Sequence, residues 1–333
     1  MALPVITRML NLLNYRTVHL ELSSKCVLKC PRCPRTELKL DRLNQEITLA
    51  DFKSGFPADV LTQIELFIFC GDIGDPIYAT EFLEIVEYIK QNSQSRIKVI
   101  TNGSYKKSTW WQQLGNLLDH NDQVTFSVDG WDNDSNNLYR VNSDFDSIVD
   151  GITSLRGASK CLIQWSMIYF SFNQDRVRDM QALAESLGCD RFQTVKSSKF
   201  DGRYLLDNTD LLKPTNNLVS STLIYELDVI QLNNTEYMPI LPQTPTRPHA
   251  WAKCLNYKKD LFVGIDGLVA PCPWFNNGYQ HNVFVEKHQD QLSIRNRSFF
   301  EIVNDTALWK QLLDSFEYNP LEICQLKCKN DQK

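Results

Sequence analysis

Six short apolar runs alternate along the chain with segments of helical periodicity, and this alternation limits the possible folds more than any other feature. The runs are Thr17–Leu22, Ile64–Phe69, Arg96–Thr101, Gln123–Val128, Leu162–Tyr169 and Arg191–Lys196. Between two of them, Phe82, Ile85, Val86 and Ile89 recur at helical spacing. Strands that alternate with helices predict a parallel sheet with right-handed crossovers. We therefore expect an α/β fold with a partial (β/α)6 TIM-like barrel, because the alternation stops near residue 200, too early for eight units.

The sequence predicts four parts. They are a lead-in over residues 1–15, the barrel over 16–205, a linker rich in Asn, Thr and Pro over 206–250, and a small domain over 251–333. Short apolar runs on both sides of Asp266 and Gly267 predict a β-hairpin in the small domain. We expect a helix over Asp305–Phe316, and one further strand around Tyr225–Leu232 in the linker.

Composition excludes some partners. The formal net charge is −5, from 35 Lys and Arg against 40 Asp and Glu, whereas nucleic acids select a basic surface. No apolar run approaches the length that spans a bilayer, and the N-terminus lacks a clean signal-peptide pattern. We therefore expect a cytoplasmic protein without nucleic-acid or membrane partners. In that compartment the ten cysteines indicate metal or redox chemistry rather than disulfides.

Three of these cysteines, Cys26, Cys30 and Cys33, fall within eight residues directly after the first apolar run. They are too close together to form three separate disulfides, but they can converge on one metal centre. Thiolates select iron–sulfur clusters or zinc, and three of them leave one coordination position open. Structural zinc almost always takes four protein ligands, and the next cysteine downstream is Cys70.

The C-x3-C-x2-C spacing of these cysteines, placed after a first strand, resembles the cluster motif of the radical S-adenosylmethionine (radical SAM) enzymes. The resemblance implies that Cys26, Cys30 and Cys33 are catalytic and hold a [4Fe–4S] cluster. The open iron of such a cluster chelates the amino and carboxylate groups of S-adenosylmethionine. Reductive cleavage then gives a 5′-deoxyadenosyl radical that abstracts a substrate hydrogen.

Segments at the ends of three later strands extend the resemblance. The positions that match cofactor-binding positions of the family are Gly74, Asp75, Thr101, Asn102, Ser127 and Arg140. The family's Gly-Gly-Glu-Pro loop corresponds here to Gly74-Asp75-Pro76, with Asp in place of Glu. The family's arginine pairs with the methionine carboxylate, and a guanidinium fork matches a carboxylate bidentately. The resemblance therefore assigns that contact to Arg140.

A second group of cysteines follows the linker: Cys254, Cys272, Cys324 and Cys328. Their arrangement looks like the twitch domain, the short form of the SPASM extension of radical SAM enzymes. This resemblance implies one auxiliary [4Fe–4S] cluster with four protein ligands. Four cysteines are also a zinc signature, so structural zinc is the alternative.

The expected function is a radical SAM oxidation or modification of a small molecule or peptide, with the auxiliary cluster as electron acceptor and a flavodoxin or ferredoxin as reductant. A peptide maturase with a separate recognition partner, or a zinc-binding protein without catalysis, are the alternatives. Cys161 and Cys189 are expected in the core, and the role of Cys70 stays open. Gln164 or Trp165, and Gln193, are candidates to face the barrel interior, depending on strand register.

Overall fold

The computed structural model describes residues 16–37, 44–195, 212–214, 223–226, 260–276, 282–318, 321 and 324. Its contacts divide the chain into two compact units. The first unit comprises Met1–Lys25, Leu40–Arg96 and Thr235–Lys333, and the second unit comprises Cys26–Lys39 and Ile97–Asn234. The division into four parts stays a prediction, and most of the lead-in and linker lies outside the described residues.

The first unit contains strands from both ends of the chain. Strand β1 (Thr17–Leu20) pairs in parallel with β2 (Leu66–Phe69) and with β8 (Asp260–Val263). Strand β8 turns back into β9 (Val269–Ala270) as an antiparallel pair. The turn needs Gly267, which has a φ of +80°. The predicted hairpin is confirmed, but its pairing with β1 was not foreseen from the sequence.

An aromatic core holds helices to this sheet. The helices are α3 (Leu49–Gly55), α4 (Ala58–Leu61), α5 (Phe82–Asn92), α11 (Val283–Leu292), α12 (Phe299–Val303) and α13 (Thr306–Tyr318), with 3-10 turns at Pro76–Tyr78 and Pro273–Asn276. The ring of Phe56 lies 5.4 Å from that of Phe67 and 5.2 Å from that of Phe299. Residues more than 200 positions apart therefore share one core. Helix α13 agrees with the helix predicted over Asp305–Phe316.

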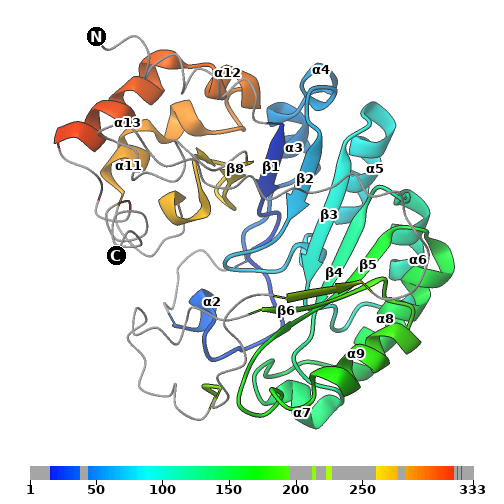
Figure 1. The fold of residues 1–333 in the computed structure, drawn as a ribbon. Helices are drawn as coiled ribbons and strands as arrows, with labels where there is room; N and C mark the ends of the chain where they lie inside the picture. Colours follow the sequence, from blue (N-terminus) through cyan, green and yellow to red (C-terminus); the bar gives the residue numbers. More distant parts are fainter. Residues whose placement is uncertain are drawn as a thin grey trace. The chain divides into compact units, whose positions relative to one another are not determined.

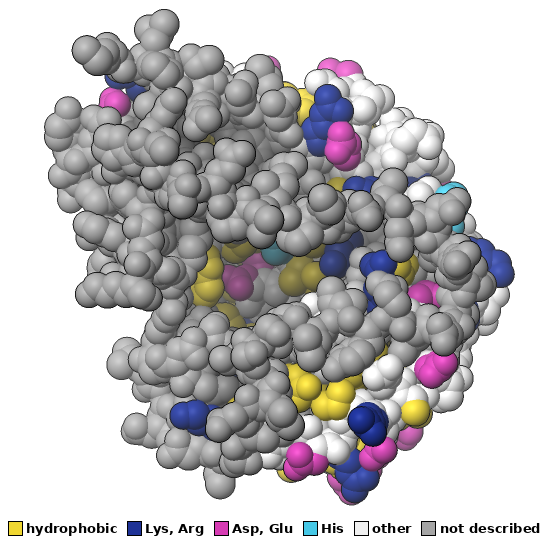
Figure 2. Space-filling model, in the orientation of Figure 1, with side chains coloured by type: hydrophobic (Ala, Val, Ile, Leu, Met, Phe, Trp, Pro, Cys, Tyr) yellow, Lys and Arg dark blue, Asp and Glu magenta, His cyan; other side chains and the backbone are white. Residues whose placement is uncertain are grey.

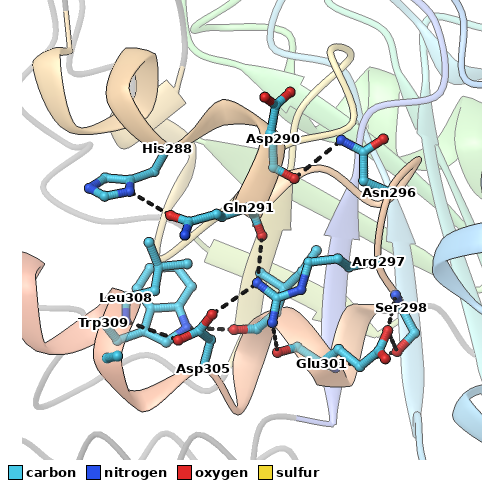
Figure 3. A network of polar contacts seen from close by, with 12 residues as sticks. His288, Asp290, Gln291, Asn296, Arg297, Ser298, Glu301, Asp305, Leu308 and Trp309 are labelled. Carbon is cyan, nitrogen blue, oxygen red and sulfur yellow. Dashed lines mark hydrogen bonds and ion pairs between the residues drawn. The ribbon is translucent and has the colours of Figure 1, made fainter.

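A polar network joins the last three helices (Figure 3). The guanidinium of Arg297 donates to the Asp305 carboxylate at 2.9 Å, to the Gln291 carbonyl at 3.2 Å and to the Glu301 carbonyl at 2.8 Å. Ser298 caps α12 through a capping box with Glu301. One side chain thus satisfies carbonyl groups of two helices and a carboxylate at the start of a third.

The second unit is built on four parallel strands. They are β3 (Arg96–Thr101), β4 (Gln123–Ser127), β5 (Leu162–Ile168) and β6 (Arg191–Val195), and the short β7 (Leu223–Glu226) adds antiparallel to β6. The helices are α2 (Pro34–Glu37), α6 (Ser108–Leu117), α7 (Asn133–Asn137), α8 (Phe145–Ala158) and α9 (Val177–Ser186). All six strands predicted in the barrel segment are present, each within two residues of the predicted ends. β7 begins two residues before the strand predicted around Tyr225, and residues 227–232 lie outside the described ranges.

One face of this sheet packs against helices. Helices α6, α8 and α9 gather on the same side of the strands (Figure 1). Phe126 on β4 lies 5.0 Å from Trp111 on α6, and Trp165 on β5 lies 6.2 Å from Phe145 on α8, between ring centroids. Phe126, Trp165 and Trp111 are fully buried. The other face is left for the chemistry described below.

On the surface drawn in Figure 2, basic and acidic side chains of the described residues lie interspersed. Within the described ranges, no helix is both long enough and apolar enough to cross a bilayer.

Candidate active site

The three cysteines of the C-x3-C-x2-C motif lie on one loop of the second unit. Cys26, Cys30 and Cys33 pack with Tyr139 and Phe170 in a single cluster, and the last two rings are 4.3 Å apart. The Cys33 amide donates to the Cys30 carbonyl at 3.1 Å, which forms a tight turn just before α2. The loop therefore places all three cysteines against one small apolar core.

The segment after Tyr139 anchors this loop. The Lys29 amide donates to the Val141 carbonyl at 2.9 Å, and the Asn142 side chain donates to the Val27 carbonyl at 2.8 Å. Asn142 has a φ of 68°, a conformation that Asn tolerates better than most residues. Asn142 was not predicted as a site residue. The sequence could have suggested it only through its position two residues after Arg140.

Asn102 reaches the first cysteine. Its amide nitrogen donates to the Cys26 sulfur at 3.7 Å, while its amide oxygen accepts from the Ser104 amide at 2.9 Å. The Leu28 amide also donates to the Cys26 sulfur, at 3.4 Å. The turn after β3 fixes the Asn102 oxygen, so its NH₂ group must face the sulfur. Such N–H···S contacts stabilise thiolate and tune the metal that it binds.

Arg140 forms a buried ion pair with Asp129. Its Nε donates to the Asp129 carboxylate at 2.6 Å, and the other carboxylate oxygen accepts from the Ile168 amide at 2.7 Å. No hydrogen bond from the two terminal nitrogens of Arg140 is found within the described residues. The pair therefore fixes one edge of the guanidinium and leaves the other edge for a ligand. Arg140 was predicted from the sequence, whereas Asp129 was not, although it belongs to the Ser127-Val-Asp-Gly segment.

Burial perturbs both members of this pair. Desolvation raises the pKa of Asp129, and the Arg140 charge opposes that change. For Arg140, burial alone would lower the pKa, but the charges of Asp129 and Cys30 raise it overall. Arg140 therefore stays positively charged close to the cysteine loop.

The other two strand-end positions of the second unit differ in surroundings. Thr101 is buried, and its hydroxyl accepts from the Gly103 amide at 3.0 Å, which supports the turn that carries Asn102. Ser127 is half-buried at the end of β4, and its hydroxyl makes no hydrogen bond within the described residues. Thr101 thus has a local structural role, whereas Ser127 can meet a ligand.

The donor set of this loop fits an iron–sulfur cluster, since three thiolates leave one iron without a protein ligand. Arg32, between Cys30 and Cys33, is only 2% exposed. It has other contacts, but its buried Nη1 makes no hydrogen bond within the described residues. This cation and Arg140 suit an anionic centre. Among the described residues, no three His, Cys, Asp or Glu side chains converge on one metal-sized point, so cluster binding requires the thiols to turn inward.

In the first unit, Gly74 and Asp75 lie on the loop after β2. A side chain at Gly74 would come within 2.1 Å of the Ser23 carbonyl, so only glycine fits there. The Asp75 amide donates to the Lys25 carbonyl at 2.9 Å, and its carboxylate accepts from the Ile77 amide at 3.2 Å. Asp75 therefore caps the Pro76–Tyr78 turn, which explains a short acid here without any cofactor.

The same loop is held by a buried acid that the sequence analysis did not single out. One carboxylate oxygen of Glu21 accepts from the amides of Asp72 and Ile73, the latter at 3.1 Å. Burial, then the nearby charge of Asp72, raises the pKa of Glu21 to about 8, with a smaller effect of Asp266. Glu21 is therefore largely protonated at neutral pH.

The remaining cysteines have separate settings. Cys161 and Cys189 are fully buried, as expected for core residues, and burial raises the pKa of Cys161 to about 11. The Cys70 carbonyl lies 3.3 Å from the His19 ring nitrogen in the first unit. Cys272 and Cys324 are half-buried in the first unit, whereas Cys254 and Cys328 lie outside the described residues. The auxiliary ligand set therefore stays a prediction.

Neither family models nor curated protein sequences give a match to this chain. Solved structures do. Streptococcus suis SuiB bound to precursor peptide SuiA gives a TM-score of 0.57 at 13% identity, over 93% of this chain and 76% of that chain. Native anSMEcpe with bound AdoMet gives a TM-score of 0.52 at 15% identity, over 86% of this chain and 81% of that chain.

SuiB and anSMEcpe are radical SAM enzymes. This chain therefore has the α/β partial-barrel fold of radical SAM enzymes, as the sequence predicted. At identities this low the likeness concerns the fold.

Proposed function

We propose that this chain is a radical SAM enzyme whose cluster is held by Cys26, Cys30 and Cys33. The observation that carries the proposal is the convergence of that loop with Asn102 and with the buried pair Asp129–Arg140 in the second unit. A [4Fe–4S] cluster held by these three cysteines would supply the electron for cleavage of S-adenosylmethionine to a 5′-deoxyadenosyl radical, which would abstract a substrate hydrogen.

The chain's own residues would bind and orient the cofactor. The free edge of the Arg140 guanidinium suits the methionine carboxylate, and Asp129 holds that guanidinium in place. Asn102 stabilises the Cys26 thiolate through its N–H group. The Ser127 hydroxyl offers a further polar contact. Gly74 and Asp75 lie in the first unit, and the cofactor contact expected of them stays a prediction that backbone groups would make, since the Asp75 carboxylate is engaged as a cap.

The auxiliary site belongs to the same proposal. Cys254, Cys272, Cys324 and Cys328 would hold a second cluster with no open iron, which suits it to take one electron from the substrate radical and so give a net two-electron oxidation. The reductant would be a flavodoxin or ferredoxin. SuiB is solved with a precursor peptide and anSMEcpe with the Cp18Cys peptide, which supports a peptide as substrate, with a small molecule as the alternative.

Anaerobic purification tests the proposal directly. We expect a brown protein with roughly eight irons and eight sulfides per chain. Incubation with a reductant and S-adenosylmethionine should release 5′-deoxyadenosine. A colourless protein that carries zinc, or one that binds iron but releases no 5′-deoxyadenosine, would reject the proposed chemistry.

Two substitutions separate the two cysteine groups. Cys26→Ala should abolish cleavage of S-adenosylmethionine, because the first cluster then lacks a ligand. Cys324→Ala should keep some cleavage but lose about half of the iron, because one cluster of two is affected. Cys161→Ala, in the core away from both groups, is the matched control. Equal cleavage by Cys26→Ala and wild type would contradict the assignment.

A further inference from the structure

The strand register of the second unit places a set of polar side chains on the sheet face opposite helices α6 and α8. Thr125 on β4 is in register with Gln164 on β5 and with Arg191 on β6. Side chains two residues apart share a face. The set, called the glutamine face here, comprises Gln123, Thr125, Ser127, Gln164, Ser166, Arg191 and Gln193.

Three amides on this face form a continuous hydrogen-bonded ladder. The Gln123 nitrogen donates to the Thr125 hydroxyl at 2.9 Å and to the Gln164 oxygen at 3.0 Å. The Gln164 nitrogen donates in turn to the Gln193 oxygen at 2.6 Å. Gln164 is only 4% exposed. The ladder therefore crosses three strands and fixes the orientation of each amide in it.

The ladder ends in an NH₂ group. The oxygen of Gln193 accepts from Gln164, and its nitrogen donates no hydrogen bond within the described residues. Gln193 is half-buried, so its two N–H donors need an acceptor. A ligand with acceptor oxygens can accept hydrogen bonds from the two N–H donors of Gln193.

Basic residues outnumber acidic ones on the strands that carry this face. Lys98 on β3 is in register with Gln123, and Arg191 lies two residues from Gln193 on β6. Strands β3 to β6 contain no Asp or Glu, and on β7 Glu226 is in register with Arg191. Lys98 and Arg191 thus outnumber this one acid, so an acceptor with negative charge is favoured over a neutral one.

The free end of the ladder lies near the cysteine loop. Gln193 is in register with Ser166, and Ile168, two residues further along β5, packs against the cluster that contains Cys26, Cys30 and Cys33. Two strand residues span about 6.6 Å. A molecule that touches Gln193 would therefore extend to the cysteine loop within the length of a small substrate.

We infer that the glutamine face binds a carboxylate group of the substrate, with the Gln193 amide as donor and Arg191 and Lys98 as the source of positive potential. Only the description of the bound molecule as substrate rests on the proposed function; the carboxylate site itself follows from the ladder and its charge. The carboxylate can belong to a free acid or to an acidic side chain of a peptide.

Ligand-observed NMR on the full chain tests the inference with matched probes. The small-molecule arm compares glutarate with glutaramide, and the peptide arm compares capped Gly-Glu-Gly with capped Gly-Gln-Gly. We expect each acid that binds to do so at least ~10-fold more tightly than its amide, which corresponds to about 1.4 kcal/mol. Binding of glutarate alone identifies a free acid, and binding of the acidic peptide identifies a peptide; either supports the carboxylate site.

Gln193→Glu is the decisive variant. Its carboxylate still accepts from Gln164, so the ladder and the fold should survive, but the donor is gone and a negative charge replaces it. We expect acid binding to fall at least ~10-fold. Gln112→Glu makes the same charge change at an exposed position of α6 and should leave binding unchanged. Arg191→Gln is a second variant in case Gln193→Glu fails to fold, and it should weaken binding of the acids and not of the amides.

If neither acid binds the wild type in preference to its amide, the inference is overturned. So would equal binding by Gln193→Glu and Gln112→Glu. Release of 5′-deoxyadenosine is measured separately on the wild type. A chain that binds acids through Gln193 but releases none would reject the proposed function and leave the carboxylate site in place.

Discussion

Two single residues act on their surroundings, Glu21 through the proton on its carboxyl and Asn102 through its amide N–H group. Glu21 is the carboxyl that holds the loop after β2, and its pKa is raised to about 8 by burial and by Asp72, with a smaller effect of Asp266. Asn102 is the side chain that donates to the Cys26 sulfur. Each leads to a testable consequence that depends on that one side chain.

Glu21 makes stability depend on pH. Its pKa is higher in the folded chain than in the unfolded chain, where it is near 4.5, so the native state retains a proton that the unfolded state has lost. Its contribution is therefore fully present below about pH 4.5 and is lost as the pH rises through about 8. We expect Gln in place of Glu21 to remove this decline, as measured by urea unfolding of the metal-free chain at pH 6 and pH 9.

The matched control is Glu84→Gln on the exposed side of α5. It should show the same loss of stability between pH 6 and pH 9 as the wild type. If Glu21→Gln loses stability as the wild type does, then the carboxyl is not protonated in the folded chain.

Asn102→Ala removes the N–H donor to the Cys26 sulfur. Loss of an outer hydrogen bond to a metal ligand typically costs about 10–100-fold in metal affinity. We expect the variant to fold and to lose iron to a chelator faster than the wild type, followed by absorbance near 400 nm. Asn121→Ala, at an exposed turn, should lose iron at the wild-type rate. Equal rates for Asn102→Ala and Asn121→Ala would show that the N–H···S contact has no such role.

Among the elements, helices α6 and α8 pack most tightly where small residues allow close approach. A Cβ atom at Gly151 on α8 would lie 2.6 Å from the Trp111 Nε1 on α6, whereas one at Gly157 on the same helix meets nothing within 4 Å. The two glycines share a helix, and only one of them is required by packing.

Alanine at these two glycines should therefore have opposite effects. Gly151→Ala forces the buried Trp111 to shift, which typically costs about 1–3 kcal/mol. Gly157→Ala improves helix propensity without a clash and should stabilise by about 0.5–1 kcal/mol. Urea unfolding of both variants measures the difference. A destabilising Gly157→Ala, or a neutral Gly151→Ala, would contradict this packing.

At the scale of elements, the sequence pattern predicted where the strands lie but not which face each side chain is on. Apolar alternation located all six strands, because a strand's own residues carry that signal. It did not decide between Gln164 and Trp165, since one residue of register inverts the two faces. The structure places Trp165 against α8, with its indole N–H donating to the Val128 carbonyl at 3.0 Å, and Gln164 on the opposite face.

For the whole molecule, cluster occupancy should be coupled to folding. The loop of Cys26, Cys30 and Cys33 is in contact with Tyr139, Phe170 and Ile168, so a cluster that binds the folded loop stabilises the chain by linkage. We expect anaerobic removal of iron by a chelator to lower the thermal midpoint by several degrees.

A variant with all three cysteines replaced by Ser is the reference for that measurement. Its thermal midpoint should respond to the chelator only through the auxiliary site, so its shift should be smaller than that of the wild type. Identical shifts in both proteins would mean that the first cluster does not stabilise the fold.

The sequence by itself determined the class of fold and the presence of a loop with three cysteines after the first strand. Both depend on neighbours in the chain: the period of the apolar residues and the spacing of Cys26, Cys30 and Cys33. It also identified Arg140, because the Ser127 motif and the arginine are close in sequence.

Only the tertiary structure decided which side chains act together. The pairing of Asp129 with Arg140, the anchoring of the cysteine loop by Asn142, the burial of Glu21 and the pairing of β8 with β1 join residues that carry no sign of one another in the sequence. The ladder from Gln123 to Gln193 is of the same kind. Its members meet because three strands align in register, and register is set by packing across the whole sheet.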